Sequence, residues 1–327
     1  LMLMEDEPIS LLHDSTQRSF RLTEPLVLKT CRNQLRLQLY SAAASNNVDI
    51  YANFPSLGID SVHLVHLDRV EALLDMLVPM TFTKREAQYL DIHGKRVTLP
   101  KMDIPSDIKW FVKTNDPYLT RMSQLSLKKW SVCFHDWEEI WPSKAITPNL
   151  NCMRHALVQM INLALTLDSE EFSEEIAAHE GEYVDSDIHY TGDEIIERIH
   201  NSYECNYGIG ACNPSSGVNG WGGGRHCGWT SMIINQDYYA KMYPTENPDT
   251  PCSRERECFY HEYSHCLGFT HDGNMTYGGV WTNVVGRAYL RAHAARKIFF
   301  YSPDFIDNLP YRRSEAPEWA TPGLAKK

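Results

Sequence analysis

The chain has 327 residues, of which 43% are hydrophobic and 22% are charged, and its formal net charge is −11. This composition is that of a globular protein and excludes a disordered, collagen-like or coiled-coil chain. The acidic balance argues against a nucleic-acid partner, because a nucleic-acid-binding protein needs a basic face. The sequence has no run of 18 or more apolar residues, so we expect no membrane span.

Short strands dominate the first third of the chain. Four segments alternate or concentrate apolar residues as strands do: 35–40, 48–51, 62–67 and 96–99. The segment 70–77 stops just before Pro79 and predicts a short helix. We therefore expect residues 1–105 to form an N-terminal arm, over residues 1–20, and a small mostly β domain that acts as a propeptide or accessory module.

A larger mixed domain is expected over residues 106–327. Thr147 and Pro148 predict a helix start, and apolar residues then follow the helical period as far as Leu165. Residues 205–229 are rich in Gly, Cys and Asn and predict a loop or a series of tight turns. A strand is expected over 230–234 and a helix over 282–299. The pattern predicts an α+β fold.

The number and spacing of the cysteines indicate the cellular compartment of the protein. The chain has nine, and the following lie close together: Cys205, Cys212, Cys227, Cys252, Cys258 and Cys266. The spacings 205–212 and 252–258 lack the short gap of a zinc knuckle, so we predict at least two disulfides among these residues. The protein would then be secreted or periplasmic. The alternative is a set of small buried thiols in a reducing compartment.

An acidic stretch covers residues 168–197, which contain no Lys or Arg. It could be a calcium site, a docking surface or a solvated acidic face. The absence of a spaced Asp-x-Asp-x-Asp-Gly loop favours the solvated face.

One segment carries recognisable chemistry, His261-Glu262-Tyr263-Ser264-His265. On a helix, positions i and i+4 share a face, so His261 and His265 can bind one metal ion. Glu262 lies about 100° around the helix and can approach a metal-bound water. Gly268 permits a sharp turn that brings His271 back as a third ligand. Three histidines leave one zinc position open, as in a catalytic site.

This segment resembles the zinc signature of the metzincin metallopeptidases, H-E-x-x-H-x-x-G-x-x-H. The resemblance implies a metzincin-like zinc peptidase domain after the small β domain, with Zn²⁺ held by His261, His265 and His271. Asn274-Met275-Thr276-Tyr277 resembles the methionine-containing turn of the clan, although the connection from His271 to Met275 is shorter than in most of its families. Met275 would support the metal site, and Tyr277 would lie near the metal and hydrogen-bond the oxyanion.

The implied function is a zinc-dependent endopeptidase that hydrolyses protein or peptide substrates through a zinc-activated water, with Glu262 as general base. The resemblance places an extended substrate along a sheet edge near residues 230–234. One alternative is a secreted zinc-bearing binding or adhesion module whose peptidase activity is incidental or lost. Another is a gluzincin-type enzyme, in which a downstream Glu or Asp replaces His271 as the third ligand.

Overall fold

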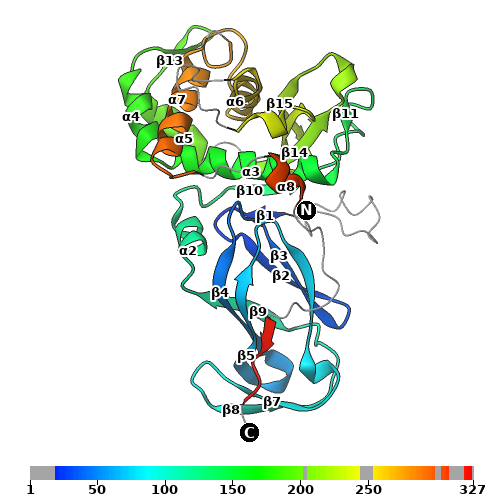
Figure 1. Ribbon diagram of the computed structural model, residues 1–327. Helices are drawn as coiled ribbons and strands as arrows, with labels where there is room; N and C mark the ends of the chain where they lie inside the picture. The colour runs from blue at the N-terminus through cyan, green and yellow to red at the C-terminus, as the bar shows by residue number, and fades with distance from the viewer. Residues whose placement is uncertain are drawn as a thin grey trace. The chain divides into compact units, whose positions relative to one another are not determined.

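The structure is a computed structural model that describes residues 19–201, 205–243, 253–277, 279–298, 303–308 and 320–325. The predicted N-terminal arm lies almost wholly outside the described residues. Helices and strands both contribute substantially, which confirms the α+β class (Figure 1). Within these ranges, no helix is long and apolar enough to span a membrane.

The chain divides into two compact units. The first unit holds the described residues before Glu24 and those from Leu125 to 308. The second unit holds Glu24–Gln124 together with 320–325. The expected boundary at 105/106 falls inside the second unit, because β9 (Lys109–Thr114) pairs with β4 (Ser45–Phe54) over its whole length. The first unit likewise includes β1 (Phe20–Arg21), which pairs with β10 (Ser131–Phe134).

The second unit consists mainly of antiparallel strands. Its remaining elements are β2 (Leu26–Cys31), β3 (Gln34–Leu39), β5 (Ile59–Val70), β6 (Asp75–Pro79), β7 (Ala87–Leu90), β8 (Arg96–Leu99), α2 (Pro117–Gln124) and β17 (Ala320–Pro322). The strand orders are β17-β5-β4-β9, β2-β3-β6 and β7-β8. The four strands expected from the sequence are confirmed as β3, β4, β5 and β8.

The helix expected over 70–77 is wrong. The segment is a strand end and a turn that leads into β6, which pairs with β3. Asp75 is 2% exposed, and its carboxylate forms an ion pair with Arg36 at 2.7 Å. A buried carboxylate needs such a partner, and the neighbouring strand supplies it.

The first unit combines one sheet with long helices. Its other elements are β11 (Ala145–Ile146), α3 (Leu150–Leu167), α4 (Glu170–Ala178), β12 (Tyr183–Asp185), β13 (Ile188–Tyr190), α5 (Gly192–Asn201), β14 (Asn206–Cys212), β15 (Gly220–His226), β16 (Trp229–Asn235), α6 (Arg254–Cys266), α7 (Val280–Ala294) and α8 (Pro303–Asp307). The sheet order is β1-β10-β14-β16-β15, in which β10, β14 and β16 are parallel and β15 is antiparallel to β16. The helix α6 packs between α7 and β15 (Figure 1).

The expected helices are present with small shifts. In α3 the N-cap is Asn149, whose side chain accepts a hydrogen bond from the backbone N–H of Cys152 at 2.8 Å, rather than Thr147. The helix expected from Thr282 corresponds to α7. Carboxylates of the acidic stretch pair with cations on and just after α7: Glu175 with Arg287 and Arg291, and Glu171 with Lys297. This part of the stretch therefore helps to hold α4 against α7.

The glycine-rich stretch 205–229 was wrongly expected to be a loop. It forms β14, β15 and the start of β16, and β15 is the edge strand, whereas residues 230–234 lie inside the sheet. A Cβ atom on Gly222 would lie 2.0 Å from the carbonyl oxygen of Glu262, and one on Gly223 would lie 2.6 Å from that of His265. Glycine is needed here because the strand runs directly against the backbone of α6.

The eight cysteines in the described ranges are free thiols, and Cys252 lies outside those ranges. Several thiols hydrogen-bond to backbone carbonyls, among them Cys258 to Asn219 at 3.4 Å and Cys266 to Ser231 at 3.3 Å. The disulfides and the secreted or periplasmic location stay predictions. Counting thiols under denaturing conditions tests both, because two disulfides would leave at most five free thiols among the nine cysteines.

Candidate metal centre

The helix α6 presents His261 and His265 on one face. Ser253 caps its N-terminus by accepting a hydrogen bond from Arg256 N–H. The negative charges of Glu255 and Glu257 in the first turn interact favourably with the positive end of the helix dipole. The Nε2 atoms of the two histidines lie 3.2 Å apart. The predicted i, i+4 pair therefore forms as the helical spacing requires.

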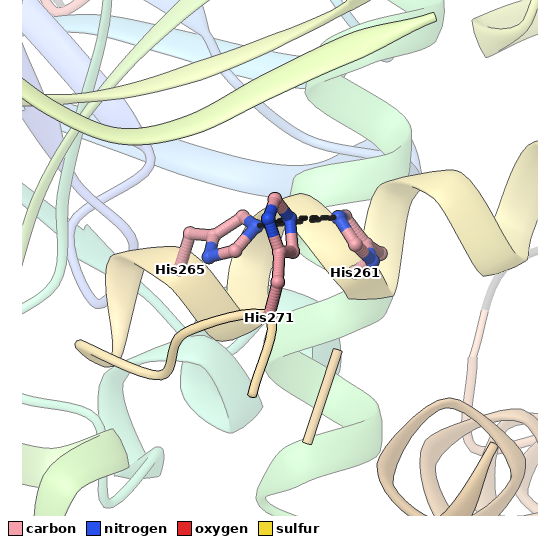
Figure 2. A group of neighbouring side chains, drawn as sticks. All are labelled: His261, His265 and His271. Carbon is pink, nitrogen blue, oxygen red and sulfur yellow. Dashed lines mark hydrogen bonds between the residues drawn. The ribbon is translucent and has the colours of Figure 1, made fainter. Parts of the chain in front are cut away.

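A tight turn after α6 returns the chain to this face. Gly268 adopts φ +87°, a left-handed conformation that ends the helix. His271 then places its Nε2 2.9 Å from that of His265 and 3.3 Å from that of His261. Figure 2 shows the three imidazole rings converging from α6 and the loop that follows it.

The geometry of these atoms fits one metal ion. Tetrahedral coordination with metal–nitrogen bonds of about 2.0–2.1 Å separates neighbouring ligand atoms by roughly 3.3 Å, close to the distances found here. His265 Nδ1 donates to the carbonyl of Phe269 at 2.7 Å, and the ring of His261 donates to the carbonyl of Thr276. With one ring nitrogen protonated in this way, Nε2 of each neutral ring directs a lone pair at the common centre.

The pKa shifts of His261 and His265 suit metal binding. Burial lowers the pKa of His261 to about 4, assisted by the neighbouring rings, and burial also lowers the pKa of His265. Neutral imidazole is the form that ligates a metal. Within the described ranges, these three histidines form the one group of His, Cys, Asp and Glu side chains close enough to hold an ion.

Glu262 lies beside the histidines and against β15. Its side chain is 7% exposed, and the backbone N–H of Gly222 donates to its carboxylate. Burial raises the pKa of Glu262 to about 8, while the hydrogen bond from Gly222 opposes the shift. A cation at the histidines would also favour the ionised form. The carboxyl group thus lies beside the histidines, with its pKa raised above the usual range of Glu.

Tyr277 and Met275 occupy different environments. The Tyr277 ring centroid lies 4.4 Å from that of His261 and 4.8 Å from that of His271, and the residue is 60% exposed. Met275 is fully buried in the turn before it. Between them, Thr276 accepts the hydrogen bond from His261 through its carbonyl and donates from Oγ1 to the carbonyl of Thr270 at 2.8 Å. The turn therefore braces one of the histidines.

Asp185, which the sequence analysis did not single out, holds the loop that carries His271. It is 5% exposed and accepts hydrogen bonds from the backbone N–H of Thr270 at 3.0 and 3.1 Å and from its hydroxyl at 2.9 Å. The backbone of the same strand pairs with Gly273. Asp185 lies 85 residues before Thr270, so no local pattern could reveal the contact.

Arg198 on α5 holds the other side of this loop. Its guanidinium donates to the carbonyl of Leu267 at 3.1 Å, where α6 ends. The same group lies 4.6 Å from the ring centroid of Tyr190 and 4.7 Å from that of Phe269. These contacts fix the exit of α6.

Two cavities meet at the cluster. One, of about 390 Å³, is lined by the three histidines, Glu262 and Tyr277 together with Lys144, Val218, Gly220, Trp221 and Gly222. The other, of about 450 Å³, shares His261, Glu262 and Tyr277 and extends along α6 to Arg254, Glu257 and Cys258. The 390 Å³ cavity therefore opens onto all three histidines, and the second cavity reaches His261.

Comparison of the chain with protein-family models, curated proteins and solved structures finds no match.

Proposed function

We propose that the first unit is a metzincin-like, zinc-dependent endopeptidase domain. The observation that carries the proposal is the convergence of three histidine Nε2 atoms, 2.9–3.3 Å apart, beside the Glu262 carboxyl in one open cavity. A closed structural site would need a fourth protein ligand, and the described residues offer none at the cluster. An open position next to a buried carboxyl suits hydrolysis.

The proposed division of labour follows the positions of the side chains. His261, His265 and His271 would hold zinc, which when bound supplies Lewis-acid activation of water and of the scissile carbonyl. Glu262 would accept a proton from the attacking water and pass it to the leaving amine. Its burial keeps the carboxyl away from bulk water, and a bound cation would favour the ionised form that accepts a proton.

Tyr277 and Met275 would support this chemistry. The exposed Tyr277 ring beside two of the histidines can place its hydroxyl near the carbonyl oxygen of a bound peptide and stabilise the oxyanion. Met275, buried in the turn that bonds to His261, would fix the floor of the site.

The substrate would bind along β15. This strand has a free edge in the described sheet and packs against α6 at Glu262 and His265. An extended peptide added to the edge would bring a scissile bond to the histidines. This placement replaces the edge expected from the sequence at residues 230–234.

The alternatives are less well supported. A gluzincin-type site would have a carboxylate in place of His271, whereas His271 Nε2 completes the cluster. A binding module needs zinc for structure alone. A buried Glu262 beside an open zinc coordination position would have no function in such a module.

Zinc content and hydrolysis test the proposal directly. The purified protein is expected to carry about one zinc per chain and to cleave casein or quenched peptides in a chelator-sensitive way. Glu262→Gln should keep zinc and the melting temperature and lose about 10²–10⁴-fold of the activity, because it removes the proton acceptor. Glu255→Gln, the same substitution in the first turn of α6, is the matched control.

Two results would contradict the proposal. The first is a protein that holds no zinc after gentle purification and takes none up on reconstitution. The second is a Glu262→Gln variant with near-normal turnover. A His271→Ala variant that retained both zinc and activity would favour the gluzincin alternative.

A further inference from the structure

The 390 Å³ cavity extends beyond the histidines to a cation and an aromatic ring that the proposed chemistry does not use. We propose that Lys144 and Trp221 form a subsite for a carboxylate group of the substrate. This inference rests on the proposed peptidase function and adds a preference for acidic substrates.

The backbone holds Lys144 at the mouth of the cavity. Its N–H donates to the carbonyl of Trp141 at 2.9 Å, and its own carbonyl accepts from Asn213 N–H at 2.8 Å. The next residue begins β11, which pairs with β14. Lys144 is thus an exposed cation on an anchored backbone.

A stacked aromatic platform supports the Lys144 side chain. Its Nζ lies 5.3 Å from the centroid of the Trp221 ring. Trp221 stacks on Trp141 at 4.2 Å with an interplanar angle of 26°, and Trp141 in turn contacts Trp137 at 5.6 Å. Cation–π contact and ring packing restrict where the ammonium can lie, so less entropy is lost when it binds an anion.

The charges of the two cavities differ. Among the described residues that line the 390 Å³ cavity, Lys144 is the one Lys or Arg and Glu262 is the one carboxyl group. No ion pair joins Lys144 to a carboxylate of the described residues. In the 450 Å³ cavity, Arg254 is accompanied by Glu257. In the first cavity, Lys144 is therefore a cation without an ion-pair partner among the described residues, and it can donate a charge-assisted hydrogen bond to a substrate carboxylate.

The strand geometry brings substrate side chains to this cation. Trp221 lies between Gly220 and Gly222 on β15, and alternation directs its ring away from the face on which those glycines meet Glu262. A peptide paired with β15 places every second side chain on the face of Trp221, with Cβ atoms about 4.5–5.5 Å from those opposite. Such a side chain would lie on the face of β15 where Lys144 sits over the Trp221 ring. A substrate C-terminal carboxylate could occupy the same subsite.

Matched peptides test the subsite. Pairs of quenched peptides carry either Glu or Gln at one position flanking the cleaved bond, and each flanking position is tested in turn. Each peptide is made with a free C-terminal carboxylate and with an amidated C-terminus. The wild type should prefer Glu at one position by about 5- to 20-fold in kcat/KM, and a preference that requires the free acid instead assigns the subsite to the C-terminus. Lys144→Gln should remove the preference and Lys144→Glu should reverse it toward a Lys peptide. Lys241→Gln, an exposed lysine of the same unit that lines neither cavity, should retain it.

Binding separates this inference from the proposed function. Fluorescence anisotropy of labelled Glu and Gln peptides with the zinc-loaded wild-type and Lys144→Gln proteins measures the preference without hydrolysis. Failure to hydrolyse any peptide would overturn the peptidase proposal. Equal binding of Glu and Gln peptides by the wild type, or a preference that survives Lys144→Gln, would overturn the carboxylate subsite.

Discussion

Replacing Asp185 with Asn should weaken metal binding although Asp185 is not one of the three ligands. The carboxylate accepts hydrogen bonds from both the N–H and the hydroxyl of Thr270, the residue directly before His271. Asn has the same shape, but its NH₂ group replaces one acceptor oxygen and faces a donor. The loop that carries the third histidine then loses part of its anchor.

The contacts give a magnitude for the effect. A hydrogen bond to a charged group contributes about 1.5–3 kcal/mol. If losing one such bond acts wholly on the loop, metal affinity falls by about 10- to 150-fold, because 1.4 kcal/mol corresponds to tenfold. This is an upper range, since part of the loss appears as lower global stability. Thr270→Val, which removes the hydroxyl and keeps the backbone bonds, should have a smaller effect.

Competition for zinc against a chromophoric chelator measures the zinc affinity of each variant. The melting temperature of the metal-free protein measures the loss of global stability. Asp187→Asn is the matched control, because Asp187 is exposed in the turn of the same hairpin. Equal zinc affinity in the wild type, Asp185→Asn and Asp187→Asn would refute the role of Asp185 in positioning His271.

Three further predictions concern packing, metal and pH. Gly222→Ala should lower the melting temperature and the activity together, since its Cβ would lie 2.0 Å from the Glu262 carbonyl oxygen; an unchanged melting temperature would contradict this packing. Removing metal with a chelator should lower the melting temperature, and it should lower the free energy of unfolding by about 4 kcal/mol relative to protein with free zinc at a thousandfold excess over Kd; calorimetry with and without chelator measures both changes. His66→Asn should destabilise the folded protein more at pH 5.5 than at pH 8.5, by less than about 1 kcal/mol. The hydrogen bond to Asp49 raises the pKa of His66 in the folded state. The stabilisation is therefore present below the unfolded-state pKa and is lost as pH rises through the folded-state pKa. Equal losses at both pH values for His66→Asn would argue against the coupling.

The histidine cluster could be predicted from local sequence because its geometry is local. A helix fixes the relative position of residues four apart, and Gly268 adopts the left-handed conformation that its lack of a side chain permits. The strand at residues 35–40 was also correctly predicted from its alternation of Leu with polar residues, although residues 35–39 are buried on both faces of β3.

Tertiary contacts decided the remainder. The glycines at 220, 222 and 223 suggest a loop by their conformational freedom, yet they belong to a strand that pairs with β16, and α6 approaches them too closely for a side chain. The turn before β6 is stabilised by a buried ion pair between Asp75 and Arg36, two residues far apart in the chain. Likewise, Asp185 and Arg198 form hydrogen bonds with the end of α6 and the loop after it, to residues 85 and 69 positions further along the chain. Contacts over such separations leave no periodic trace in the sequence, because they are selected by the three-dimensional packing that brings the segments together.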